Sequence, residues 1–561
     1  MNEKNKKFNW LKSIAINLVI MVVAILFTHM VYETNDDYVI ASRIADGYPE
    51  VYFINYYLCE ALIKLQPLMA SYNAFVVAQI AMSFISFVCI LKLIMDKSDN
   101  SKIVIMAVAV IALFSIDHYC TIQFSKTAAV ITVAGSMLIM DALTEKRNFL
   151  YYLFGVLFML IGAGLRIEGV VVPLGFAAIY GVKWMIENRD GLGGKLKAMS
   201  PALIIVLVAV IGGSGLLFFA NYRANSCTQE LAEYVEYNDL RTRVIDYSVL
   251  DYYDDQKAEY DKAGLSAGDV KLIKAWVFDY DGAASKENLQ KILDIGKGSN
   301  SSDMTPKKAT RRFVKTSIKD VKGLQPTGVH IIVLAMLGLW MLLFAKPSGK
   351  LFVILVVLAT AVLHIALIFI ERPAYRALYV PDVCAAVYLL YAAADLKDLG
   401  RVKSAPTILI AVLSLLLILP IYKDANKTYQ SNSKRIMSEE MAEFLDSNKD
   451  NFYVIATREK KSNASYLTPL KVPDTKSESN FMGTGSWGTK SPYLFEKMEP
   501  YGIKNPIKDL IDNDKAYYMG NKNIEVLTDY YNKWYVTGTK KIRLEQVGEV
   551  SGIKLWSVKT K

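Results

Sequence analysis

The sequence is poor in the side chains that usually hold soft metal ions. It contains four histidines and five cysteines in 561 residues, and they stand singly, without a C-x-x-C or H-x-x-x-H pattern. A zinc site built from these residue types is therefore not indicated. Four of the cysteines lie in or beside apolar segments, so no disulfide framework is indicated either. A metal ion in this protein would have to be held by carboxylates, which favours Mg²⁺ or Mn²⁺.

The sequence also lacks the features of a processed or a nucleic-acid-binding protein. No small-residue cleavage site of the A-x-A type follows the first apolar run, so this run is predicted to be a retained helix. The net charge is +10, but the membrane-proximal excess is spread over short loops between apolar runs. This distribution reflects orientation in a membrane, and no nucleic-acid partner is expected.

Long apolar runs dominate the chain, since hydrophobic residues make up 53% of it. The runs reach about 17 residues or more, enough for a helix to cross a hydrocarbon core roughly 30 Å thick. We predict a polytopic α-helical membrane protein with about eleven transmembrane helices. They are placed near residues 11–31, 73–95, 103–118, 125–143, 149–165, 169–186, 201–220, 328–345, 351–370, 377–395 and 405–421.

Lysine and arginine alternate between the loops in a way that sets the orientation. One set of loops is rich in them, beginning with the N-terminal "MNEKNKK" and including Lys97, Lys146 and Arg147. The alternate short loops carry few. The positive-inside rule then predicts a cell-membrane protein with a cytoplasmic N-terminus and an extracytoplasmic C-terminal region.

This orientation divides the chain into two predicted domains. Residues 1–421 form the transmembrane domain, with an outer loop at 32–72 and a large, charged outer loop of helical pattern at 221–327. Apolar residues at helical spacing in "INYYLCEALIKL" predict an interfacial helix inside the first loop. Residues 422–561 form a small soluble α/β domain, with strands at "NFYVIAT", "KAYYMG", "KIRLEQV" and "GIKLWSV" and a helix at "IEVLTDYYNKWY".

Charged residues recur in the short outer loops. They are Asp36 and Asp37 after the first span, Lys126 at the mouth of the fourth, Arg166 and Glu168 in "GLRIEGVV" between the fifth and sixth, and Arg372 and Arg376 in "FIERPAYR" between the ninth and tenth. Ionisable groups near hydrocarbon need partners, a wet cavity or a ligand. An acidic pair opposite arginines suits the activation of a hydroxyl or amide while a phosphate departs.

Each of these residues also has a plain structural interpretation. Asp37 would be a good N-cap for a helix beginning in "DYVIASRIA". Arg166 and Glu168 would pair with each other or with a neighbouring span. Lys126 would extend its charged end to the interface. The convergence of three short turns on one face favours a site over a polar collar.

The "NDDY" of the first outer loop, and more loosely "LRIEG" and "ERPAYR", stand in a topology that resembles the GT-C-type glycosyltransferases. The likeness covers nearly the whole chain: an N-in first span, an acidic pair, an interfacial helix, many further spans and an outer soluble domain. It implies an enzyme that transfers a sugar from a polyprenyl-phosphate-linked donor to a glycan, lipid or protein acceptor of the envelope.

The resemblance also implies roles for the candidate residues. Asp36 or Asp37 would be the general base or would bind a divalent cation, Mg²⁺ or Mn²⁺, with Glu168 as a second carboxylate. Arg166, Arg372 and Arg376, together with Lys126, would contact the donor phosphate.

Two other functions remain open. A polymerase, ligase or flippase for lipid-linked glycans would share the outer arginines without needing the first-loop aspartates. A transporter or a non-enzymatic envelope protein would favour charges near the bilayer midplane, where Asp382 is the main example.

The segment "GTGSWG" (483–488) matches the dinucleotide pattern G-x-G-x-x-G. The preceding "DTKSESNFM" is polar, and "TKSP" follows instead of a helix start. We predict a glycine-rich surface loop, in which Trp487 would offer a stacking platform for a sugar.

Overall fold

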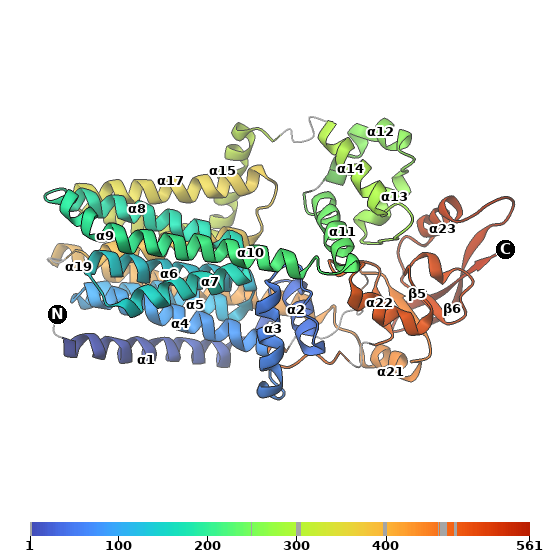
Figure 1. Cartoon of the computed structure of the whole chain (residues 1–561), viewed down its shortest axis with the longest axis horizontal. Coiled ribbons are helices and arrows are strands. Elements are labelled where there is room, and N and C mark those ends of the chain that lie inside the picture. Colours follow the sequence, from blue (N-terminus) through green and yellow to red (C-terminus); the bar gives the residue numbers. More distant parts are fainter. Residues whose placement is uncertain are drawn as a thin grey trace.

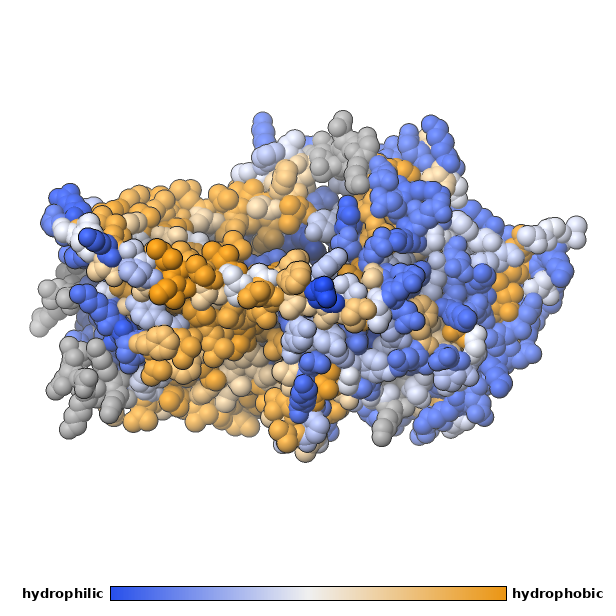
Figure 2. Space-filling view, in the orientation of Figure 1, coloured by the Kyte–Doolittle hydropathy of each residue, from blue (hydrophilic) through white to orange (hydrophobic). Residues whose placement is uncertain are grey.

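The computed structural model describes residues 3–247, 249–298, 304–396, 401–457, 459, 468–475 and 479–561. It consists of a bundle of long helices and, at one end of that bundle, a body of shorter helices and strands (Figure 1). The face of the bundle seen in Figure 2 is covered by hydrophobic residues, whereas hydrophilic residues cover most of the body. This contrast is expected of a bundle that lies in lipid and a body that lies in water.

Membrane-spanning helices make up the bundle. Among the described residues, ten helical stretches are long and apolar enough to cross a membrane, and the shorter apolar helix 149–165 accompanies them. The predicted polytopic fold with about eleven spans is therefore confirmed. The bundle contains α1 (Glu3–Phe27), α4 (Ala74–Lys97), α5 (Ser101–Cys120), α6 (Phe124–Glu145), α7 (Phe149–Leu165), α8 (Val171–Glu187), α9 (Leu192–Leu207), α10 (Gly213–Ala224), α16 (Pro326–Phe344), α17 (Pro347–Phe369), α18 (Tyr375–Ala393), α19 (Arg401–Leu416) and α20 (Ile418–Ser433).

Two spans extend further than predicted. The stretch Leu192–Ala224 runs through a π-helical turn for 33 residues, or about 50 Å, so it projects beyond a bilayer core. The last stretch continues to Ser433 instead of ending near residue 421. Its polar sequence after residue 421 suggested the start of the soluble domain. The helix continues because Ile421 and Ala425, one turn apart, are buried in the bundle.

Helices α6 and α7 approach closely at two glycines. A Cβ added to Gly135 would lie 2.7 Å from the carbonyl oxygen of Gly155, and one added to Gly155 would lie 2.6 Å from Cγ1 of Ile139. Small residues allow such close packing of membrane helices. The contact fixes the start of α6, which carries Lys126, relative to the end of α7, which leads to Arg166.

The predicted midplane charge, Asp382 of α18, is fully buried and paired. Its Oδ1 lies 3.0 Å from Nε2 of His364, and its Oδ2 lies 3.3 Å from Nδ1 of His330. Two of the four histidines of the chain thus satisfy one intramembrane carboxylate.

The segment after α1 is tied to the end of α5. Strand β1 (Val31–Tyr32) pairs in parallel with β2 (Thr121–Ile122), and two helices follow, α2 (Asn35–Asp46) and α3 (Tyr56–Leu65). Helix α3 confirms the helix predicted in this loop, and it runs across the bundle axis at the end of the bundle (Figure 1). The short sheet brings the first loop to the start of α6.

The body contains a five-stranded sheet with the order β4-β3-β5-β7-β6. Strand β3 is parallel to β4 and β5, and β7 is antiparallel to β5 and β6. All four predicted strands and the predicted helix, α23, are confirmed; β4 was not predicted because it has only three residues. The elements are β3 (Phe452–Ile455), β4 (Phe481–Gly483), β5 (Ala516–Met519), β6 (Ile542–Val550), β7 (Ile553–Thr560) and α23 (Ile524–Trp534).

Helices cover both faces of this sheet. Phe452 and Val454 of β3 belong to a core shared with helices of the large loop, whereas Tyr453 and Ile455 pack toward α21 (Glu439–Ser447). The large loop and the C-terminal segment therefore share one hydrophobic core, while the domain boundary at residue 421 stays a prediction. The other helices are α11 (Gln229–Ile245), α12 (Lys257–Lys262), α13 (Ala267–Lys274), α14 (Lys286–Gly298), α15 (Pro306–Lys322), which packs on α16 and α17, and α22 (Pro492–Met498).

The segment Gly483–Gly488 is largely buried, so the predicted surface loop is wrong. A Cβ at Gly485 would lie 2.1 Å from Cδ2 of Phe278, which shows how closely the large loop packs here. Trp487 is 3% exposed, and its ring lies against Phe53 with centroids 5.3 Å apart. It is therefore not available as a platform for a sugar. A short strand, β4, does precede the glycines, which the polar sequence before them did not indicate. No helix opens at the third glycine, since α22 begins only at Pro492, so the exclusion of a dinucleotide fingerprint holds on this second ground.

Candidate functional site

Asp36 and Asp37 lie in the first turn of α2. The helix begins at Asn35 with Thr34 in the N-cap position, so the alternative in which Asp37 caps this helix is wrong. Acidic residues in a first turn interact favourably with the helix dipole. Because successive helical residues point about 100° apart, the two carboxylates face different surroundings.

Asp37 points into the protein and is 0% exposed. Its Oδ1 accepts hydrogen bonds from the backbone N–H of Phe124 at 2.9 Å and from Nε2 of Gln79 at 3.2 Å. In the described part of the chain its Oδ2 has no hydrogen-bond partner. Burial raises the pKa of Asp37 well above its usual range, and the negative charge of Asp36 raises it further. Asp37 thus joins α2 to the start of α6.

Asp36 faces the charged loops and keeps 18% of its side chain exposed. Its Oδ2 lies 3.9 Å from Nη2 of Arg376 and accepts a hydrogen bond from Oγ1 of Thr34 at 3.3 Å. Burial raises the pKa of Asp36, and Arg376 partly opposes this shift. A partly exposed carboxylate with a raised pKa has the properties of a general base.

The three predicted arginines gather around this carboxylate. Nη1 of Arg166 donates to Oγ of Ser125 at 2.9 Å, and Nη2 of Arg372 lies 3.4 Å from Oδ2 of Asp246. Burial is the largest cause that lowers the pKa of Arg166, and the nearby charges of Arg376 and Arg372 lower it further. The structure therefore places Arg376 beside Asp36, while Arg166 and Arg372 lie in the same charged region with partners of their own.

Glu168 occupies the edge of this group. Its carboxylate lies 3.6 Å from Nε of Arg166, and its side chain is 72% exposed. This is the pairing that the plain structural interpretation expects. The catalytic role expected for Glu168 stays a prediction.

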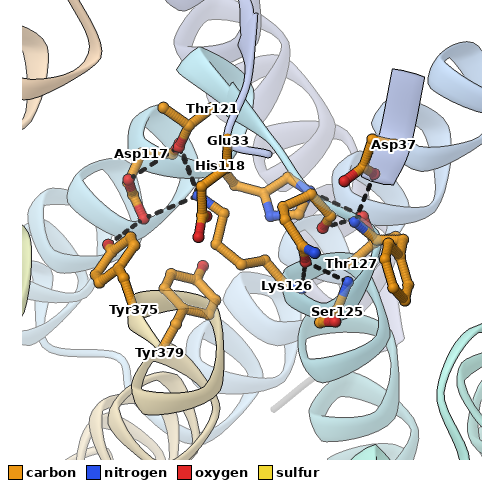
Figure 3. Close-up of polar contacts among 12 residues, drawn as sticks. Glu33, Asp37, Asp117, His118, Thr121, Ser125, Lys126, Thr127, Tyr375 and Tyr379 are labelled. Atoms are coloured by element: carbon orange, nitrogen blue, oxygen red, sulfur yellow. Dashed lines mark hydrogen bonds and ion pairs between the residues drawn. The ribbon is translucent and has the colours of Figure 1, made fainter. Parts of the chain in front are cut away.

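Lys126 is completely buried and already has anionic partners (Figure 3). Its Nζ lies 3.4 Å from Oδ2 of Asp117 and 3.7 Å from Oε2 of Glu33, and it donates to Oγ1 of Thr121 at 2.6 Å. The hydroxyl of Tyr375, one residue before Arg376, donates to Oδ2 of Asp117 at 2.7 Å. Lys126 therefore ties the loop that carries Asp36 to α5 and α18.

A chain of buried polar groups leads away from Asp37. Gln79, which donates to Asp37, accepts a hydrogen bond from Oγ1 of Thr127 at 3.0 Å. Nε2 of His118 lies 3.3 Å from the same hydroxyl and 2.6 Å from Oγ of Ser83. These contacts hold α2, α4, α5 and α6 together beneath the acidic pair.

Sequence reasoning missed Glu33, Asp117 and Arg241 of α11. Asp117 offered a signal, because "IDHY" places an acid and a histidine at the end of an apolar run. Glu33 lies two residues before "NDDY", where only the acidic pair was considered. Arg241 lies in a charged helical segment, where nothing local marks it as buried.

A divalent cation would depend on few protein ligands. The described part of the chain contains no group of three or more His, Cys, Asp or Glu side chains that could hold a metal ion. Asp37 has one unpartnered carboxylate oxygen and Asp36 is partly exposed. Mg²⁺ commonly takes one or two carboxylates together with water and substrate phosphates. Asp36 fits this role for a cation that arrives with a phosphate, whereas Asp37 is fully buried and faces other surroundings.

Comparisons with known proteins add little. No family model matches the sequence, and no curated protein matches it. One solved structure that resembles the chain is the crystal structure of ArnT from Cupriavidus metallidurans bound to undecaprenyl phosphate, with 10% identity, 97% of each chain covered and a TM-score of 0.36. A TM-score and identity this low carry no argument about function. The proposal below therefore rests on the residues of this chain.

Proposed function

We propose that this protein is a membrane glycosyltransferase that moves a sugar from a polyprenyl-phosphate-linked donor to an acceptor of the cell envelope on the outer membrane face. The observation that supports it is the position of Asp36, a partly exposed carboxylate next to Arg376 and close to Arg166 and Arg372 at the end of the helix bundle. At this level a lipid-borne phosphate meets water. The alternation of basic loops assigns this end to the outside.

In the proposed reaction, the oxygen of the acceptor hydroxyl attacks the anomeric carbon of the donor sugar, and Asp36 accepts the proton of that hydroxyl. The bond between that carbon and the phosphate oxygen breaks, and its electron pair leaves with the polyprenyl phosphate. Arg376, Arg166 and Arg372 stabilise the negative charge that develops on the phosphate.

The buried groups position this site. Asp37 holds the first turn of α2 against the N-terminus of α6 through the N–H of Phe124. Lys126 pairs with Glu33 and Asp117, so we assign it to positioning and no longer to phosphate binding. A cation that arrives with the donor would be held by Asp36 and would, when bound, neutralise charge on the donor phosphate.

Transport is the second candidate, because Asp382 with His330 and His364 forms a buried titratable group inside the bundle. Transporters commonly place such groups on the ion path. It is less well supported, since both carboxylate oxygens of Asp382 already have histidine partners, whereas Asp36 is accessible.

Transfer can be tested with the purified protein in detergent. The protein would be incubated with polyprenyl-phosphate-linked sugars and envelope extract, and release of polyprenyl phosphate would be measured by mass spectrometry. We expect Asp36→Asn to lower the rate at least about 100-fold, because general-base catalysis contributes about 10²–10⁴.

Glu60→Gln is the matched control, because Glu60 is a partly exposed carboxylate of the same loop, 4.0 Å from the exposed Lys64. Its rate should stay at the wild-type value. Full activity of Asp36→Asn and of the double variant Asp36→Asn/Asp37→Asn would refute the proposed base.

A further inference from the structure

A buried polar seam lies between α2 and α11, beneath the glycine-rich loop. We define the α2–α11 seam by Arg43 of α2, by Tyr234, Asn238 and Arg241 of α11, and by Trp487. The three α11 residues are spaced four and three apart and so share one helix face. The hydroxyl of Tyr234 donates to the carbonyl oxygen of Trp487 at 3.2 Å, which joins α11 to the loop.

Arg43 enters the seam from α2. A Cβ added to Gly488 would lie only 2.9 Å from Nη2 of Arg43, so the third glycine of "GTGSWG" leaves space for this guanidinium. The guanidinium also stacks on the ring of Tyr493, 3.3 Å from its centroid. The first loop, the large loop and the C-terminal segment therefore meet at one point.

The seam contains two buried cations without a paired anion. Arg43 is 4% exposed and Arg241 is 1% exposed, and within the described ranges neither has a carboxylate oxygen within 4.0 Å. Arg241 donates only to neutral groups, Oδ1 of Asn238 at 2.7 Å and Oγ1 of Thr242 at 2.9 Å. Burial lowers the pKa of both arginines, as expected for a charge removed from water.

Three buried N–H groups of the seam also have no hydrogen-bond acceptor among the described residues. They are Nη1 of Arg43, Nδ2 of Asn238 and Nε1 of Trp487. The nearby carboxylates have other partners, since Asp46 accepts from the Tyr493 hydroxyl at 2.8 Å and Asp246 pairs with Arg372. Buried donors without acceptors and an uncompensated buried charge are each costly. An anion bound in the seam would compensate the buried positive charge and accept hydrogen bonds from these N–H groups.

The seam leads directly to the candidate base. Asp36 and Arg43 are seven residues apart on α2 and so lie on one helix face, about 10 Å apart along its axis. Arg241 is close enough to Asp36 to act against the burial that raises the pKa of that carboxyl. A group held by Arg241 and Arg43 would therefore be bound beside Asp36.

We propose that the α2–α11 seam binds an anionic group, a phosphate or a carboxylate, on the acceptor of the transfer. The acceptor is then an acidic or phosphorylated sugar or headgroup whose hydroxyl is presented to Asp36. The assignment of the bound anion to the acceptor rests on the proposed function, but anion binding in the seam can be measured without any transfer.

The test is binding of soluble probes to the purified full-length protein in detergent, measured by isothermal titration calorimetry. Glucose 6-phosphate and glucuronate represent the two anionic groups, and glucose is the neutral control. We expect at least one anionic sugar to bind at least 10-fold more tightly than glucose. Arg43→Gln and Arg241→Gln should each remove this preference. Arg243→Gln, an exposed neighbour on the same helix that pairs with Asp239, should keep it.

A short-chain isoprenyl phosphate separates this site from the donor site. Its binding should weaken in Arg166→Gln and stay unchanged in Arg43→Gln and Arg241→Gln. Asp36→Asn should retain binding of the anionic sugar even where transfer is lost, so the two proposals fail separately. Equal binding of glucose and both anionic sugars, or loss of the preference in Arg243→Gln, would overturn the seam as an anion site. Equal weakening of the isoprenyl phosphate in the seam variants would overturn its assignment to the acceptor.

Arg241→Met guards against a variant that merely fails to fold. Replacing an uncompensated buried cation by an apolar side chain of similar volume is often neutral or stabilising. We expect its melting temperature to equal or exceed that of the wild type while anion binding is lost. A lowered melting temperature with unchanged binding would show that Arg241 has only a structural role.

Discussion

Oδ2 of Asp36 lies 3.9 Å from Nη2 of Arg376, which joins the first turn of α2 to the first turn of α18. The contact connects two segments that are far apart in the sequence, one after the first predicted span and one before the tenth. Arg376 follows Tyr375, whose hydroxyl is bound to Asp117, so its position is fixed by the buried cluster around Lys126. The candidate base and a candidate phosphate ligand are thus placed by the same set of contacts.

Arg376→Gln should lower the rate of transfer, because it removes a cation from the departing phosphate. Loss of one such donor typically costs about 10²–10³ in rate. We expect the double variant Asp36→Asn/Arg376→Gln to be little slower than the slower single variant, since residues that act on one step are not additive. Initial rates of polyprenyl phosphate release would measure this. A double variant whose rate loss equals the product of the two single losses would show that Asp36 and Arg376 act independently.

Asp37→Asn should raise stability at neutral pH. The folded-state pKa of Asp37 lies well above its usual value, so the folded protein binds the proton more tightly than the unfolded chain does. The stability contributed by this proton is complete below the ordinary aspartate pKa and is lost as pH rises through the raised one. An asparagine has no such dependence, and it keeps an acceptor for the N–H of Phe124.

The gain in stability of Asp37→Asn over the wild type should therefore appear at about pH 7–8 and vanish at about pH 4. Thermal unfolding in detergent, followed at several pH values, would measure it, with Glu60→Gln as the variant that leaves the pH dependence unchanged. An equal loss of stability in Asp37→Asn at every pH would contradict the prediction.

The parts of the structure that follow from local pattern could be predicted. Spans such as Ala74–Lys97 are visible in hydropathy, and the short apolar run of β3 indicates a strand buried on both faces, as Phe452 and Tyr453 show. The meeting of Asp36 with Arg376 followed from topology, because the counting of spans put both loops at one end of the bundle.

Side-chain direction and long-range packing could not be predicted. Which of two adjacent aspartates faces the arginines depends on where α2 begins, and Thr34 at the N-cap position fixes it. Lys126 was expected at the donor phosphate because it lies at the mouth of the fourth predicted span, and no local signal shows that Asp117 and Glu33 pair with it. Trp487 was expected at the surface because no local signal shows that Phe53 covers it.

Cys227 provides a test of orientation. It is the exposed cysteine in the structure, whereas Cys59, Cys89, Cys120 and Cys384 are buried. It follows α10 at the start of the large loop, so the predicted orientation places it outside the cell. We expect a membrane-impermeant maleimide to label intact cells that express the protein and to leave Cys227→Ser unlabelled. Labelling only after the cells are permeabilised would reverse the orientation and exclude transfer on the outer face.

Divalent cations should bind only together with the donor. Asp36 and Asp37 supply too few oxygens to hold Mg²⁺ or Mn²⁺ tightly, and the donor phosphate would supply the rest. We expect EDTA to abolish transfer, Mg²⁺ or Mn²⁺ to restore it, and calorimetry to detect no tight cation binding to the protein alone. Transfer that persists after EDTA would leave Asp36 as a base without a metal.

Lys126→Met should destabilise the protein strongly. It leaves Glu33 and Asp117 buried without their cation, and breaking a buried ion pair by removing one partner typically costs about 3–5 kcal/mol. The double variant Lys126→Met/Asp117→Asn should regain part of this stability, because it also removes one of the two stranded charges and keeps an acceptor for the Tyr375 hydroxyl. Melting temperatures in detergent would be compared with Lys64→Met, in which an exposed lysine is lost with little effect. A double variant whose loss equals the sum of both single losses would show that Lys126 and Asp117 do not stabilise each other. The loop that carries Asp36 would then be held in place by its other contacts, such as the β1–β2 pairing and the bond from Phe124 to Asp37, and Lys126 would again be a candidate contact for the donor phosphate.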